Sequence, residues 1–138
     1  MRRSIMKDEA FLGRASAPAT EDDLPVGDDL RDTLAAHEHE CVGMAANMIG
    51  VSRRVIVFAD GLTGRSMVMF NPEIVAKADP YETREGCLSL EGERPATRYR
   101  RITVTYRDRR WRERAARFEG FTAQIIQHEI DHCDGILI

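Results

Sequence analysis

The sequence lacks the features that mark membrane, secreted and nucleic-acid-binding proteins. No apolar run in its 138 residues approaches the roughly 18 that suggest a membrane helix. The basic start at Met1 is soon interrupted by the charges of residues 7–9, so we expect no signal-peptide core. A formal net charge of -3 argues against a generic nucleic-acid binder. We therefore expect a cytoplasmic protein whose partners are neither a membrane nor a specific nucleic acid.

Cysteine is scarce as well. The chain has three, Cys41, Cys87 and Cys133, an odd number without the spacing of a disulfide framework. This usage suits a reducing compartment, where cysteine together with histidine more often indicates a metal site or catalysis than disulfide bonds.

The composition is that of an ordinary globular protein, with 43% hydrophobic and 31% charged residues. The length suits one domain, which we expect to span residues 1–138. Acidic residues dominate between positions 8 and 40, and arginines dominate between positions 94 and 117. We interpret these segments as two solvated faces. The alternative, a basic edge that docks on RNA or on the ribosome near its exit tunnel, lacks interleaved aromatic residues and a known motif.

Hydrophobic patterning predicts one early helix and a series of strands. The helix is expected over Val26–Glu40, capped by Asp28 or Asp29. We expect Asn71-Pro72 and Asp79-Pro80 to interrupt the strands, because proline removes a backbone donor. Strands are expected at residues 53–59, 66–70, 74–78, 102–106 and 111–118, the first two forming a hairpin.

A second helix is expected from Phe121 or Thr122 to Cys133, with Thr122 as its cap and Gly135 ending it. Strands followed by one terminal helix predict an α+β fold, with antiparallel sheets packed around that helix.

This last helix carries a His-Glu-x-x-His motif. Residues four apart share a helix face, so His128 and His132 can bind one metal ion, with Glu129 beside them to move a proton. Phe121 and Ile125 continue the same face and predict an apolar pocket wall next to the metal.

A catalytic site of this kind needs a third protein ligand and one open position. Cys133 follows His132 directly and points about 100° away around the helix, which makes it a poor partner. Cys41 and Cys87 remain open, because free cysteine is often only a small buried hydrophobe.

Three motifs in a fixed order resemble those of the peptide deformylases. Glu85-Gly86-Cys87-Leu88-Ser89 matches that family's Glu-Gly-Cys-x-Ser, and residues 127–132 match its Gln-His-Glu-x-x-His. The family's Gly-x-Gly-x-Ala-Ala-x-Gln is only partly kept, because Cys41 replaces its first Gly and Met48 replaces its Gln. The chain also stops at Ile138, without the C-terminal helix of many members, and so resembles a short form.

The resemblance implies that Cys87, His128 and His132 bind one divalent metal ion. It implies ferrous iron in the cell, with zinc, nickel or cobalt accepted instead. One thiolate and two imidazoles suit any of these ions.

The resemblance also implies the reaction, which removes the formyl group from the N-terminal formyl-methionine of new peptides and releases formate. Glu129 would move the proton, and the backbone N–H of Leu88 would stabilise the oxyanion. The family's Gln is the other oxyanion donor, and the thioether of Met48 cannot donate. Asn47 is a candidate to supply an amide in its place.

For the substrate, the resemblance implies an added strand that bonds to the backbone at Val42 and Gly86. The methionine side chain would enter a pocket of Val42, Gly43, Phe121 and Ile125. Arg94 matches a family arginine near the substrate's exit path and is otherwise a surface arginine. Glu85 is a candidate to orient a ligand or brace an arginine.

Two alternatives compete with a metal-dependent deformylase. One is a deformylase-like metal-binding protein that binds N-terminal methionine peptides with little turnover, because of Met48. The other is a general metallopeptidase, which the small residues of the 43–46 stretch argue against.

Overall fold

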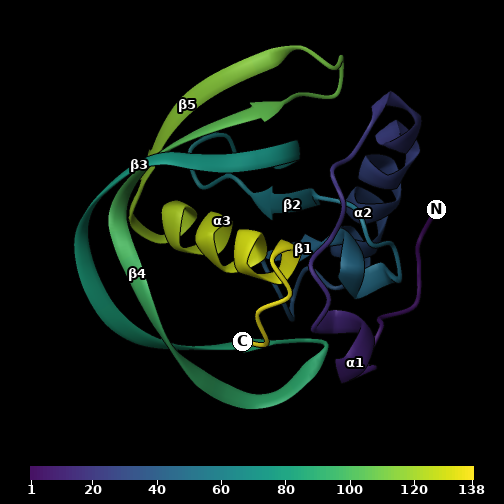
Figure 1. The fold of residues 1–138 in the computed structure, drawn as a ribbon, viewed down its shortest axis with the longest axis horizontal. Helices are drawn as coiled ribbons and strands as arrows, with labels where there is room; N and C mark the ends of the chain where they lie inside the picture. The colour runs from purple at the N-terminus through teal and green to yellow at the C-terminus, as the bar shows by residue number, and fades with distance from the viewer.

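A computed structural model describes all residues from Met1 to Ile138. A strongly curved sheet wraps around the last helix, and the earlier helices lie on the other side of β1 and β2 (Figure 1). The elements in chain order are α1 (Glu9–Leu12), the 3-10 helix η1 (Glu21–Asp23), α2 (Leu24–Ala36), β1 (Gly43–Ala45), the 3-10 helix η2 (Ala46–Ile49), β2 (Val55–Ala59), β3 (Ser66–Cys87), β4 (Leu90–Arg107), β5 (Glu113–Glu119) and α3 (Gly120–Cys133).

The sheet has the order β1-β2-β3-β4-β5, and every neighbouring pair is antiparallel. The expected α+β fold with antiparallel strands around the C-terminal helix is confirmed. The expected hairpin is confirmed too, because β2 pairs with the start of β3 from Val55↔Phe70 to Ala59↔Ser66.

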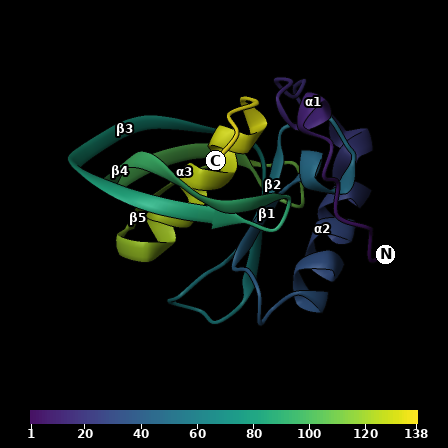
Figure 2. The same ribbon diagram turned by 90° about the horizontal axis from the view of Figure 1, so that it is seen from below.

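The two expected strand breaks are wrong. β3 runs without interruption past both proline positions, and Pro80 lies opposite Tyr99 in the register with β4. The register shifts between Phe70 and Glu73, and Asn71 has a φ of 52° there, so a bulge accommodates the proline without ending the strand. These irregularities bend β3 and β4 around α3 (Figure 2).

The early helix begins and ends sooner than expected. α2 begins at Leu24 with Pro25 in its first turn, a position where the missing proline N–H costs nothing. The expected caps Asp28 and Asp29 therefore lie inside the helix, and residues 37–40 form turns instead of its last turn.

The two faces of β2 bury two separate clusters. Ile56 and Phe58 pack with α3, whereas Val55 and Val57 pack with Leu30 and other residues of the α2 side. This alternation follows from the two-residue period of a strand. β1 and β2 are thus covered on both faces, which fixes the position of α3 relative to the sheet.

α3 begins at Gly120 with Glu119 as its N-cap residue, so the expected capping by Thr122 is wrong. Its end agrees with the expectation, because Gly135 follows with a φ of 76°. A Cβ at Gly135 would also stand 2.7 Å from the carbonyl oxygen of Gly13, so the position needs glycine for two reasons. None of the helices is long and apolar enough to cross a membrane.

Candidate active site

Three side chains converge between the end of β3 and the second half of α3. The ligand atoms of Cys87, His128 and His132 all lie within 4.8 Å of one another. Cys87 is the last residue of β3, where the register shifts as the chain turns into β4. The two histidines are one helical turn apart on α3. Of the three cysteines, Cys87 is the one that the fold brings to the histidines, whereas Cys133 packs in the α3 core.

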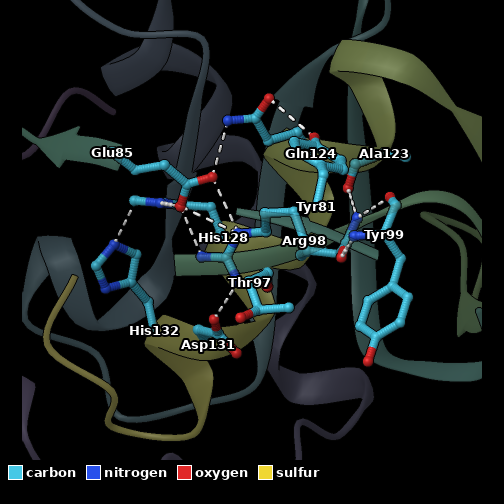
Figure 3. Close-up of polar contacts among 11 residues, drawn as sticks. Tyr81, Glu85, Thr97, Arg98, Tyr99, Ala123, Gln124, His128, Asp131 and His132 are labelled. Carbon is cyan, nitrogen blue, oxygen red and sulfur yellow. Dashed lines mark hydrogen bonds and ion pairs between the residues drawn. The ribbon is translucent and has the colours of Figure 1, made fainter. Parts of the chain in front are cut away.

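The imidazole rings present their Nε2 atoms to each other at 2.9 Å. The other nitrogen of His128, Nδ1, contacts Oε1 of Glu85 at 2.8 Å (Figure 3). A partner on the distal nitrogen is the usual arrangement of a metal-binding histidine, because it fixes the ring and its tautomer. Two converging imidazole nitrogens and one thiol therefore fit a single divalent ion with a preference for nitrogen and sulfur.

The electrostatics separate the two histidines. Burial lowers the pKa of both, but hydrogen bonding with Cys87 and Glu85 outweighs it and raises the pKa of His128 to about 10. Burial and the neighbouring charge of His128 lower the pKa of His132 to about 3. The carboxylate of Glu85 thus faces His128, and no carboxylate faces the ring of His132.

Glu129 has a buried carboxylate with a free oxygen. Its Oε1 has no hydrogen-bond partner in the protein, although the residue is only 4% exposed. Burial raises the pKa of Glu129 to about 7. A carboxylate that titrates near neutrality and has an unused oxygen is suited to general acid–base work.

A buried charge network supports the site from behind. Arg98 donates to both oxygens of Glu85 and, at 2.6 Å, to Asp131, while Gln124 donates to Glu85 at 2.9 Å (Figure 3). Burial raises the pKa of Glu85, but hydrogen bonds with His128, Arg98 and Gln124 have the larger effect and lower the pKa to about 2. Glu85 is therefore a permanent carboxylate held against His128.

Sequence reasoning placed Arg98 on a solvated face, which is wrong, since the residue is only 4% exposed. The arginine-rich composition around it hid its role, because a buried arginine cannot be told from its solvated neighbours by composition. A signal was available on α3. Gln124, His128 and Asp131 follow one another at spacings of four and three residues, so their polar groups share one helix face.

A cavity of about 610 Å³ opens in front of this cluster. Val42 and Phe121 are exposed at its rim, and Ile125 is buried deeper in its wall. Five of the six expected substrate-binding residues line it, namely Val42, Gly43, Gly86, Phe121 and Ile125, together with Met48, Leu88, Glu85 and Glu129.

Arg94 is the expected substrate residue outside this lining. It lies opposite Glu85 in the β3–β4 register, and its guanidinium is 4.0 Å from a carboxylate oxygen of Glu9.

Met48 and Asn47, which follow one another in η2, point to different places. Met48 is buried in the cavity wall, and its Sδ accepts a hydrogen bond from the backbone N–H of Ala45 at 3.5 Å. Asn47 does not line the cavity. Its Nδ2 donates to the carbonyl oxygen of His132 at 2.8 Å, so this amide is engaged behind the metal cluster.

Known proteins resemble this chain over its full length. A family profile described as polypeptide deformylase matches residues 6–138. The chain is 53% identical over 138 residues to a peptide deformylase of Clostridium beijerinckii, covering 100% of both chains. It is 34% identical to a peptide deformylase of Rhizobium meliloti, covering 96% of this chain and 80% of the relative.

Solved structures agree with the sequence matches. A class I type b peptide deformylase from Acinetobacter baumannii, bound to Met-Ala-Ser, superposes with a TM-score of 0.86 at 30% identity, covering 99% of this chain and 97% of the other. A peptide deformylase from Legionella pneumophila gives a TM-score of 0.86 at 34% identity, covering 99% and 83%. The chain belongs to the peptide deformylase family.

Proposed function

We propose that this protein hydrolyses the formyl amide at the N-terminal formyl-methionine of newly made peptides and releases formate. One observation carries the proposal. Glu129, whose Oε1 has no hydrogen-bond partner in the protein, lines an open cavity together with Cys87 and His128 of the candidate metal cluster. Membership of the peptide deformylase family supports the same reaction.

Cys87, His128 and His132 would hold one divalent ion, which would act as a Lewis acid and lower the pKa of a water molecule. We propose ferrous iron in the cell, with zinc, nickel or cobalt as substitutes, because one thiolate and two imidazoles bind all four. Glu85 keeps the His128 ring in position through its contact with Nδ1.

Glu129 would take the proton from the attacking water and pass it to the leaving amine nitrogen. Its pKa of about 7 suits both steps, because the group can accept and return a proton near neutral pH. The backbone N–H of Leu88, which lines the cavity, would donate to the developing oxyanion. Met48 occupies the position of a further donor and contributes none.

The peptide would bind along β1, which is an edge strand of the sheet with a free side. Backbone groups at Val42 and Gly86 would hold it, and its methionine side chain would enter between Gly43, Phe121 and Ile125. The Acinetobacter baumannii relative was solved with Met-Ala-Ser, a peptide that begins with methionine.

We place the protein in the cytoplasm, where new peptides begin with formyl-methionine and where its three free cysteines stay reduced. The arginine-rich segment does not add a ribosome contact to this proposal. Arg101, Arg109 and Arg114 pair with Asp79, Asp28 and Asp108, which supports a solvated face.

The test is formate release from formyl-Met-Ala-Ser by protein loaded anaerobically with iron, and separately with nickel or zinc. We expect turnover in wild type, and in Glu129→Gln the loss of turnover with one metal ion per chain still bound. Absence of formate at every metal loading would refute the hydrolase and favour a binder of methionine peptides. Full metal content in Cys87→Ala would refute the ligand assignment.

A further inference from the structure

The two candidate histidine ligands are held in different ways. The His128 ring is fixed through Nδ1 by Glu85, which is itself held by Arg98 and Gln124. The His132 ring makes one polar contact within the protein, and that contact is with the other ligand, His128. The orientation of His132 therefore depends on its backbone, because no further side chain hydrogen-bonds to its ring.

That backbone is anchored from the first half of the chain. Asn47 donates to the His132 carbonyl at 2.8 Å, and the backbone N–H of Ser16 donates to the Cys133 carbonyl at 2.8 Å. Arg54 contacts the Cys133 carbonyl at 3.3 Å and the Asp134 carboxylate at 2.7 Å. The last carbonyls of a helix lack full helical partners. The His132 carbonyl also accepts from the backbone N–H of Gly135 at 3.0 Å, so Asn47 is the donor that ties this carbonyl to another part of the fold.

We propose that Asn47 is a positioning residue for the metal, because its amide fixes the last turn of α3 and with it the His132 ring. This proposal rests on the ligand assignment given above. Asn47 is only 1% exposed, and its Oδ1 has no partner. Burying that oxygen costs free energy, so an apolar residue would serve better if Asn47 only filled space.

η2 thereby links the two sides of the site. Its Met48 forms part of the cavity wall, and the preceding Asn47 reaches α3 behind the metal cluster. The amide is engaged there, so Asn47 acts on the metal and does not replace the missing oxyanion donor. The two roles differ in what they predict, because a positioning residue changes metal retention and an oxyanion donor changes turnover alone.

The variant for the test is Asn47→Leu, which keeps the shape of the side chain and removes its polar atoms. Thr33→Val is the matched control. Thr33 is fully buried in α2, and its hydroxyl donates to the backbone carbonyl of Asp29 at 2.8 Å. α2 contributes no residue to the metal cluster. Arg54→Met tests the same helix end from another element.

The measurement is the rate at which excess chelator removes cobalt from each loaded protein, followed by the visible absorption of the bound ion. We expect Asn47→Leu to release cobalt roughly 10–100-fold faster than wild type, as for other residues that orient ligands. Thr33→Val should release it at the wild-type rate. If Asn47→Leu does not fold, faster cobalt release from Arg54→Met supports the proposal that donors at the last turn of α3 position the metal. An unchanged rate of cobalt release overturns that proposal.

An unchanged release rate in Asn47→Leu would overturn the proposal, and so would equal acceleration in Thr33→Val, which would indicate general destabilisation. Lower turnover with unchanged release would assign Asn47 to the oxyanion instead. Cys87→Ala separates the two proposals. If Cys87→Ala released cobalt at the wild-type rate, the ligand assignment itself would be wrong.

Discussion

Gly43 and Glu129 face each other across the active-site wall so closely that a side chain on the first would displace the second. A Cβ at Gly43 would stand 2.9 Å from Oε2 of Glu129 and 2.7 Å from Cγ2 of Ile125. Both distances are shorter than the contacts that Cβ atoms make with other heavy atoms in real proteins. The glycine therefore sets where the carboxylate lies relative to the metal cluster.

We expect Gly43→Ala to lower kcat by about 10²-fold, because a shift of about 1 Å in a catalytic group has that effect. Metal content should stay at the wild-type level, since the three atoms nearest to the added Cβ belong to Ile125 and Glu129 and not to a ligand. Steady-state formate release and metal analysis measure the two quantities. Gly61→Ala is the control, because a Cβ there meets only Thr122 Oγ1 at 3.4 Å. Unaltered kcat in Gly43→Ala would contradict the assigned role of Glu129.

Met48→Gln is expected to raise kcat/KM, by up to about 10²-fold, because it restores a side-chain donor at the oxyanion position. Met48→Leu serves as the control and should leave the rate unchanged, since neither side chain can donate a hydrogen bond. Formate release at limiting substrate measures both. A glutamine variant no faster than wild type would mean that Leu88 and the metal already stabilise the oxyanion fully, without a further donor.

Arg98→Met should destabilise the fold by about 3–5 kcal/mol, because it leaves Glu85 and Asp131 charged beneath the site without their shared partner. Arg101→Met provides the comparison. Arg101 pairs with Asp79 at the surface, and an exposed pair contributes at most about 1 kcal/mol. Urea denaturation of the metal-free proteins gives both free energies. Similar losses in the two variants would argue against the buried network.

Thiol alkylation should reveal the pKa values of two cysteines. Burial raises the pKa of Cys41 to about 11 and that of Cys133 to about 12. Only the thiolate reacts, so at pH 8 Cys41 should react roughly 100-fold more slowly than free cysteine, and its rate should rise about tenfold per pH unit. Cys133 should stay unmodified until the protein unfolds. Iodoacetamide labelling followed by peptide mass spectrometry measures each rate, and rapid labelling of folded Cys133 would contradict its burial.

The sequence predicted those parts of the site that depend on short-range spacing. His128, Glu129 and His132 lie on one helix, so their relation follows from the helical period. Arg98 was missed because its partners Glu85 and Asp131 are distant in sequence. The pairing of β3 with β4 brings Glu85 to Arg98, and the packing of α3 against β4 brings Asp131. The uninterrupted course of β3 was missed for a related reason. A bulge that leaves a proline out of the hydrogen bonding between two strands has no signature in local composition.

α3 follows the curved sheet in the chain, and donors from residues 16–54 join the backbone N–H groups of residues 134–136 in holding its final turn. A ribosome therefore finishes the curved sheet before it makes the helix that fills it. Until then the concave face of β2–β4 exposes side chains such as Ile56, Met69 and Val104 to water. We therefore expect the partly made chain to be prone to aggregation, and the metal site to form only once α3 has packed against the sheet.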